Sequence, residues 1–123
     1  MASQTKQLTP MAFVSDVTRS IAFYEHLGFV VGNTFTPADA DKPSWAWLSS
    51  GNAHLMITNA CDPVVPEQQA ILFYLYVDDV AATRDELVAA GLQPGPIENP
   101  PYAPHGEFRL TDPDGFTLMI MHT

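Results

Sequence analysis

The stretch Val14-Ser15-Asp16-Val17 returns 63 residues later as Val77-Asp78-Asp79-Val80. Each copy closes a short apolar segment and opens a helical pattern that stops at a glycine, Gly28 in the first copy and Gly91 in the second. A repeat of this length indicates two copies of one supersecondary unit, neither of which can bury its apolar face alone. The region between two such copies is where we expect a ligand site.

Hydrophobic periodicity predicts the same order of elements in both copies. The first copy is predicted to hold strands at 8–14, 29–35, 45–49 and 53–58 and a helix at 17–27. The second is predicted to hold strands at 70–77, 92–97, 105–111 and 116–122 and a helix at 80–90. Pro94 and Pro96 weaken the prediction of a strand at 92–97. We therefore predict an α+β fold of two βαβββ modules, residues 8–58 and 71–121, joined by a linker at 59–70 within one domain spanning 1–123.

Composition limits the class of protein. A hydrophobic fraction of 46% with 15% charged residues is typical of a globular chain. The net charge of −9 argues against nucleic acid or an anionic membrane as a partner. No apolar run approaches the roughly 20 residues of a membrane helix. The single cysteine, Cys61, fits a reducing compartment, so we expect a cytoplasmic protein.

Period-2 alternation assigns the strand residues to faces. With Gly51 and Asn52 as a two-residue turn, Trp45 lies opposite Thr58 and Trp47 lies opposite Met56. The opposite face carries aliphatic residues suited to packing under the helix: Ala46, Leu48, Leu55 and Ile57. Through the repeat, the second copy is predicted to place Phe108, Leu110, Thr117, Met119 and Met121 on the face that corresponds to the tryptophans. Thr9, Met11 and Phe13 share a face of the first strand, as Leu72, Tyr74 and Tyr76 do on the fifth.

These aromatic, thioether and polar side chains form the candidate ligand-binding set. Its members are Met11, Phe13, Trp45, Trp47, His54, Met56, Tyr74, Tyr76, Phe108, Met119 and Met121. Methionine adapts to varied partners, and tryptophan and tyrosine offer flat stacking area with a polar edge. The alternative is that the set fills the interior as core. Leucine, isoleucine and valine are more typical of core, so we favour a binding surface.

Several motifs resemble the vicinal oxygen chelate superfamily, which contains glyoxalase I, extradiol dioxygenases and the fosfomycin and bleomycin resistance proteins. The motifs are Leu8-Thr9-Pro10, Arg19-Ser20-Ile21-Ala22-Phe23-Tyr24-Glu25, Leu27-Gly28-Phe29 and the closing Glu107-Phe108-Arg109-Leu110-Thr111-Asp112-Pro113-Asp114-Gly115-Phe116. The resemblance covers essentially the whole chain. It implies paired βαβββ modules whose eight strands form one curved sheet around a cup, and a homodimer with sites at or near its interface.

The resemblance also locates the positions where enzymes of this superfamily hold a divalent metal with His and Glu. Those positions fall on Thr9, Met56, Leu72 and Met119, none of which is a carboxylate or an imidazole. We therefore expect no metal, no other cofactor and no catalytic residue. His54 is the histidine best placed to act as a base, although the sequence offers it no acidic partner.

The function expected is that of the bleomycin resistance branch: metal-independent binding of a planar or cationic antibiotic-like molecule by a homodimer. An enzyme is the alternative, either a lyase or dioxygenase with metal ligands at other positions or a metal-free enzyme that uses His54. A third hypothesis is that the protein binds a metabolite unrelated to resistance. The loop at 36–43 is expected to lie near the site mouth as a lid.

Overall fold

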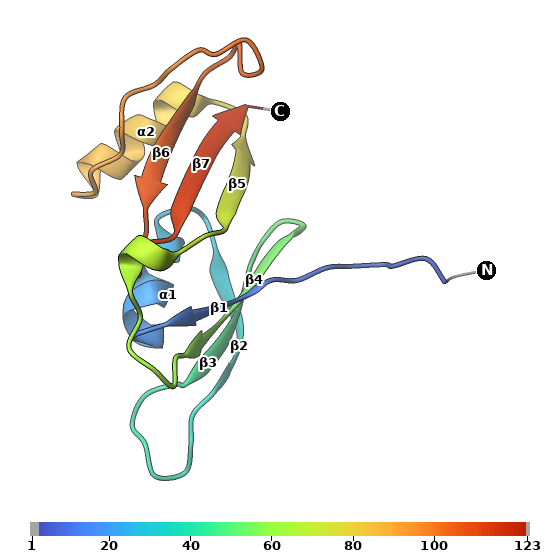
Figure 1. Ribbon diagram of the computed structural model, residues 1–123, viewed down its shortest axis with the longest axis vertical. Helices are drawn as coiled ribbons and strands as arrows, with labels where there is room; N and C mark the ends of the chain where they lie inside the picture. The colour runs from blue at the N-terminus through green and yellow to red at the C-terminus, as the bar shows by residue number, and fades with distance from the viewer. Residues whose placement is uncertain (1–2, 123) are drawn as a thin grey trace. The chain divides into compact units, whose positions relative to one another are not determined.

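A computed structural model describes residues 3–122 and divides the chain into two compact units. Unit 1 runs to Val64, and unit 2 begins at Val65. Two helices and two sheets make this a mixed α+β protein, as the sequence predicts (Figure 1). The single domain, the superposition of the two repeats and the cup between them remain predictions.

Unit 1 contains the predicted order of strand, helix and three strands. These are β1 (Met11–Val14), α1 (Val17–Glu25), β2 (Val30–Phe35), β3 (Trp45–Ser50) and β4 (Ala53–Asn59). The strands form one sheet in the order β1-β4-β3-β2, with β1 parallel to β4 and the other pairs antiparallel. The hairpin pairs Trp45 with Thr58 and Trp47 with Met56, in the predicted register.

Unit 2 opens with a short 3-10 helix, η1 (Pro66–Gln68). It continues with β5 (Leu72–Val77), α2 (Val80–Ala89), β6 (Glu107–Thr111) and β7 (Thr117–His122). The sheet order is β5-β7-β6, with β5 parallel and β6 antiparallel to the central β7.

The strand predicted at 92–97 does not form, so the described residues hold seven strands in two sheets rather than eight strands in one. The segment still follows the edge of β6. Gly95 N donates to Arg109 O at 2.8 Å, and Glu98 forms an isolated antiparallel bridge with Glu107. Pro94 and Pro96 have no N–H to donate, so a regular ladder gives way to these scattered contacts.

Both helices begin at the predicted aspartate caps. Asp16 Oδ1 accepts from Arg19 N at 3.2 Å, and Asp79 Oδ1 accepts from Ala82 N at 2.9 Å. The first helix ends two residues earlier than predicted, at Glu25. Its final turn tightens into i→i+3 hydrogen bonds that end with Gly28 N donating to Glu25 O.

Each helix packs on one face of its own sheet, and the core of each unit lies between them. In unit 1 the buried strand residues are the predicted aliphatic set, Ala46, Leu48, Leu55 and Ile57. In unit 2 they include Phe108, Leu110, Leu118 and Ile120. Within residues 3–122, no helix has both the length and the apolar character needed to cross a membrane.

The two faces of the unit 2 sheet can be distinguished by one pair of leucine variants. Leu118 is 0% exposed on the helix side, whereas Leu72 is 50% exposed on the opposite side. Leu118→Ala is expected to lower the free energy of unfolding by about 2–5 kcal/mol, and Leu72→Ala by less than about 1 kcal/mol. Denaturant unfolding measures both values. Equal losses would show that the helix does not distinguish the faces.

Candidate functional site

The sheet face of unit 1 that points away from α1 is here called open face 1. Parallel pairing sets Met11 beside Met56, and the hairpin sets Met56 beside Trp47. A neighbouring row joins Phe13, Thr58 and Trp45 in the same way. Cross-strand partners project from the same face of a sheet, so these side chains gather on one surface as predicted.

Exposure on open face 1 increases from the centre of the sheet towards its edges. Trp45, Trp47, His54 and Met56 on the central strands are half-buried, whereas Met11 and Phe13 on β1 are exposed. Phe13 leaves 55% of its surface open to solvent. The tryptophans are therefore held by their neighbours on the sheet while part of each side chain remains accessible.

Phe35 also belongs to open face 1, although it is not among the residues predicted to bind a ligand. It pairs with Trp45 and is 59% exposed. An irregularity between Val31 and Asn33 shifts the register of β2. Gly32 lies at this shift, where a Cβ would come within 3.4 Å of Trp47 Cδ1. Alternation along β2 alone could not locate this shift.

His54 lies beside Trp47 on the same face, with 5.5 Å between the two ring centroids. Its Nδ1 is buried and has no hydrogen-bond partner. The imidazole is therefore held against the indole by packing and keeps one nitrogen unused. Within residues 3–122 no group hydrogen-bonds to Nδ1, so the enzymatic alternative has no orienting group for His54 on that nitrogen.

The equivalent face of unit 2, open face 2, consists of two rows that run across its three strands. One row joins Tyr76, Met121 and Glu107, and the next joins Tyr74, Met119 and Arg109. The tyrosines on β5 are exposed, whereas both methionines on the central strand are buried. Glu107 and Arg109 are therefore neighbours of the predicted tyrosines and methionines, although neither belongs to the predicted binding set.

The placement of Phe108 in the binding set is wrong. It pairs with Ile120, not with Met119 or Met121, and is 1% exposed on the helix side of the sheet. Leu110 was predicted on the same face as Phe108 and also lies on the helix side, because it pairs with the buried Leu118. The second hairpin has a five-residue connection between Thr111 and Thr117, where the first has two residues, so β6 is displaced by one position relative to the repeat. A one-residue displacement moves every side chain to the other face.

A hydrogen bond joins Glu107 to Tyr102 in the segment before β6. Tyr102 OH donates to Glu107 Oε1 at 2.7 Å, while Glu107 Oε2 is buried and has no partner. The hydrogen bond to Glu107 is the largest of the causes that raise the pKa of Tyr102 above its ordinary 10.0. The phenol therefore stays protonated at physiological pH and remains a donor to the carboxylate.

The residues at the metal positions of the resemblance do not fit a divalent metal. Thr9 precedes β1, Leu72 is half exposed, and Met56 and Met119 provide only weakly coordinating thioethers. Within residues 3–122, no group of three or more His, Cys, Asp or Glu side chains could hold a metal ion. We therefore derive no chemical step through a metal.

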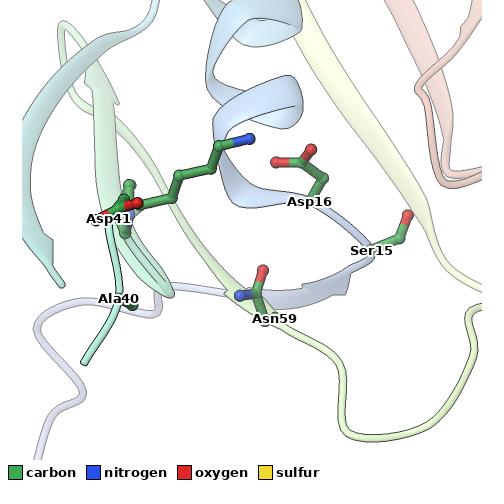
Figure 2. Close-up of a pocket in the computed structure, with 7 residues that line it drawn as sticks. Ser15, Asp16, Ala40, Asp41 and Asn59 are labelled. Carbon is green, nitrogen blue, oxygen red and sulfur yellow. The ribbon is translucent and has the colours of Figure 1, made fainter. Parts of the chain in front are cut away.

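A separate hollow of about 430 Å³ lies at the end of β1 and β4, under the loop at 36–44 (Figure 2). Two of its polar groups help to fix the start of α1: Asp16 caps the helix, and Asn59 Oδ1 accepts from Val17 N at 3.3 Å. It is lined by Ser15, Asp16, Ala40, Asp41, Lys42, Pro43 and Asn59. The predicted lid loop thus contacts this hollow, and none of the candidate binding residues lines it.

The raised pKa of Tyr102 can be measured by ultraviolet titration of phenolate. The difference between the wild-type and Tyr102→Phe titrations is expected to show ionisation above pH 10.0, because the Glu107 carboxylate accepts the phenol proton. Glu107→Gln should shift that ionisation towards its ordinary value, since it removes the negative charge. A difference titration centred at or below 10.0 in the wild type would contradict the hydrogen bond.

Comparisons with known proteins place the chain in a family. Residues 6–120 match the model of the Glyoxalase/Bleomycin resistance protein/Dioxygenase superfamily. The bleomycin resistance determinant encoded on transposon Tn5 is 25% identical, with a TM-score of 0.75 over 97% of this chain and 98% of that chain. A bleomycin-binding protein complexed with bleomycin is also 25% identical, with a TM-score of 0.75 over 97% of this chain and 99% of that chain.

An antibiotic-binding protein from Streptomyces sp. CB03234, TnmS3, shares the fold at 23% identity, with a TM-score of 0.77 over 99% of this chain and 98% of that chain. A search of curated proteins gave no match. The family match covers nearly the whole chain, including both units. This chain belongs to the Glyoxalase/Bleomycin resistance protein/Dioxygenase superfamily.

Proposed function

We propose that this protein is a metal-independent binding protein that takes up a flat, antibiotic-like small molecule. The observation that carries the proposal is the exposure of aromatic side chains on the sheet faces turned away from the helices. Phe13 and Phe35 flank the two tryptophans on open face 1, and Tyr76 on open face 2 is 57% exposed. Large apolar surfaces that remain open typically mark places where a protein binds something.

The arrangement on open face 1 suits a planar ligand. Trp45 and Trp47 alternate along β3 and are supported by Thr58 and Met56 on β4, so their rings are held before any ligand arrives. A preorganised aromatic side chain loses little conformational entropy when it stacks on a ligand. Met11 and Met56 add thioethers that adapt to the outline of the bound molecule.

The relatives support the same function. Two solved structures at 25% identity are a bleomycin resistance determinant and a bleomycin-binding protein in complex with bleomycin. The net charge of −9 favours the approach of a cationic ligand through long-range attraction. The residues at the positions where enzymes of the superfamily hold a metal include no histidine and no carboxylate. This supports ligand binding without a metal.

The proposed assembly is a homodimer. Apolar side chains exposed on β1 and β2, including Phe13, Val30 and Phe35, leave an uncovered surface that a small domain seldom tolerates in isolation. A second copy of the chain would cover part of that surface.

Binding can be tested with bleomycin as the probe and tryptophan fluorescence as the signal. Both tryptophans of the chain lie on open face 1, so saturation should quench the emission. Trp47→Ala is expected to weaken binding by about 1–3 kcal/mol. Val88→Ala, which shortens an exposed side chain on α2, serves as the control and should bind as the wild type does.

Thermal unfolding of the same variants separates binding from packing. Trp47→Ala should unfold within a few degrees of the wild type if the ring serves the ligand. A loss of several kcal/mol, as at emptied core positions, would show that Trp47 is core. Unchanged bleomycin affinity in a folded Trp47→Ala protein would contradict its role on open face 1.

Assembly can be checked by multi-angle light scattering. The expected molar mass at micromolar concentration is twice the 13.5 kDa of one chain. A mass of one chain that persists across the micromolar range would exclude the proposed homodimer.

A further inference from the structure

We propose that Glu107 is the residue that selects a cationic ligand on open face 2, by accepting a hydrogen bond from a positively charged N–H group on its unpartnered oxygen. This inference rests on the proposed binding function and adds to it the residue that recognises the positive charge of the ligand.

The state of the Glu107 side chain is the first observation. The residue is 4% exposed, Oε1 accepts from Tyr102 OH at 2.7 Å, and Oε2 is buried with no donor. A buried carboxylate oxygen without a donor is unfavourable, because it has lost water and gained nothing in exchange. The Tyr102 hydrogen bond occupies Oε1 only, so Oε2 is left as an unused acceptor.

The charge of the neighbouring residue is a second, independent observation. Glu98 forms an antiparallel bridge with Glu107, in which each backbone N–H donates to the other residue's carbonyl, at 2.8 and 2.9 Å. Directly opposed partners project from the same face, so both acidic side chains leave the backbone on the same side. Like charges placed opposite each other destabilise a sheet. A cation bound at this pair would relieve the repulsion and supply the donor that Oε2 lacks.

The surface beside this pair indicates the shape of the ligand. Glu107, Met121 and Tyr76 are partners in one row across β6, β7 and β5, which spans about 10 Å between the outer strands. A flat ring system laid along this row would stack on the exposed Tyr76 ring, with its charged nitrogen directed across β7 towards Glu107. The ligand class is therefore a planar aromatic cation with an N–H group at one end.

Arg109 does not reverse this preference. It projects from the same face two residues along β6, but it is exposed, so water and salt screen its charge. Glu107 is buried, where the effective dielectric constant is lower and a charge acts more strongly on a neighbouring group.

The test compares two fluorescent dyes of similar size and shape on the full-length protein. Proflavine is a flat cation with N–H donors at neutral pH, and acridone is a flat neutral molecule. The wild type is expected to bind proflavine more tightly than acridone. Glu107→Gln should lower the affinity for proflavine about tenfold or more, as expected for loss of a charge-assisted hydrogen bond. The affinity for acridone should change by less than about twofold.

Three further variants make the comparison specific. Glu86→Gln removes the same charge from an exposed position on α2 and should leave both affinities unchanged. Glu98→Gln should weaken proflavine by about twofold to threefold, since its carboxylate is exposed and screened. Tyr102→Phe should bind proflavine as tightly as the wild type or more tightly, because both oxygens of Glu107 then lack a donor. This variant also tests the inference if Glu107→Gln fails to fold.

The outcomes separate the two proposals. If both dyes bind and Glu107→Gln weakens proflavine no more than Glu86→Gln does, the role of Glu107 is wrong and the binding function stands. A loss of proflavine affinity in Tyr102→Phe would also overturn the role of Glu107. If the wild type binds neither dye nor bleomycin, the proposed function fails and this inference fails with it.

Discussion

Within residues 3–122 each unit has one α-helix, and a helix can cover only one face of a sheet. This constraint determines which side chains pack under the helix and which lie on the face turned away from it. The helix-facing positions are occupied by residues such as Leu48 and Ile57 in unit 1 and Leu118 and Ile120 in unit 2. Strand alternation then forces every second residue onto the uncovered face. The concentration of tryptophan, methionine and tyrosine on those faces gives the protein its candidate site.

The parts of the fold that depend on local signals could be predicted from the sequence. Asp16 and Asp79 mark the starts of the helices because an aspartate side chain can cap the first free N–H groups. The pairing of Trp47 with Met56 followed from a two-residue turn, whose geometry leaves a single register. These predictions needed no knowledge of the tertiary structure.

The errors arose where register depends on the length of a connection or on contacts distant in sequence. Phe108 was placed on the wrong face because the turn after β6 is longer than its counterpart in unit 1 by an odd number of residues. Phe35 was missed because the register of β2 shifts near Gly32, which alternation along the strand does not reveal. The contact between Tyr102 and Glu107 joins a Pro-rich segment to a strand edge, and no periodic pattern encodes it.

The central claim is that ligands bind on the faces turned away from the helices. Four of the five methionines project from those faces: Met11, Met56, Met119 and Met121. Methyl-labelled methionine is therefore a direct probe of ligand binding there. In NMR spectra recorded while proflavine is added, we expect methionine methyl resonances to shift through the ring current of the dye. The methyl resonances of the helix-facing Leu48 and Leu118 should remain in place. Shifts confined to those leucines, with unchanged methionine resonances at saturation, would contradict the account.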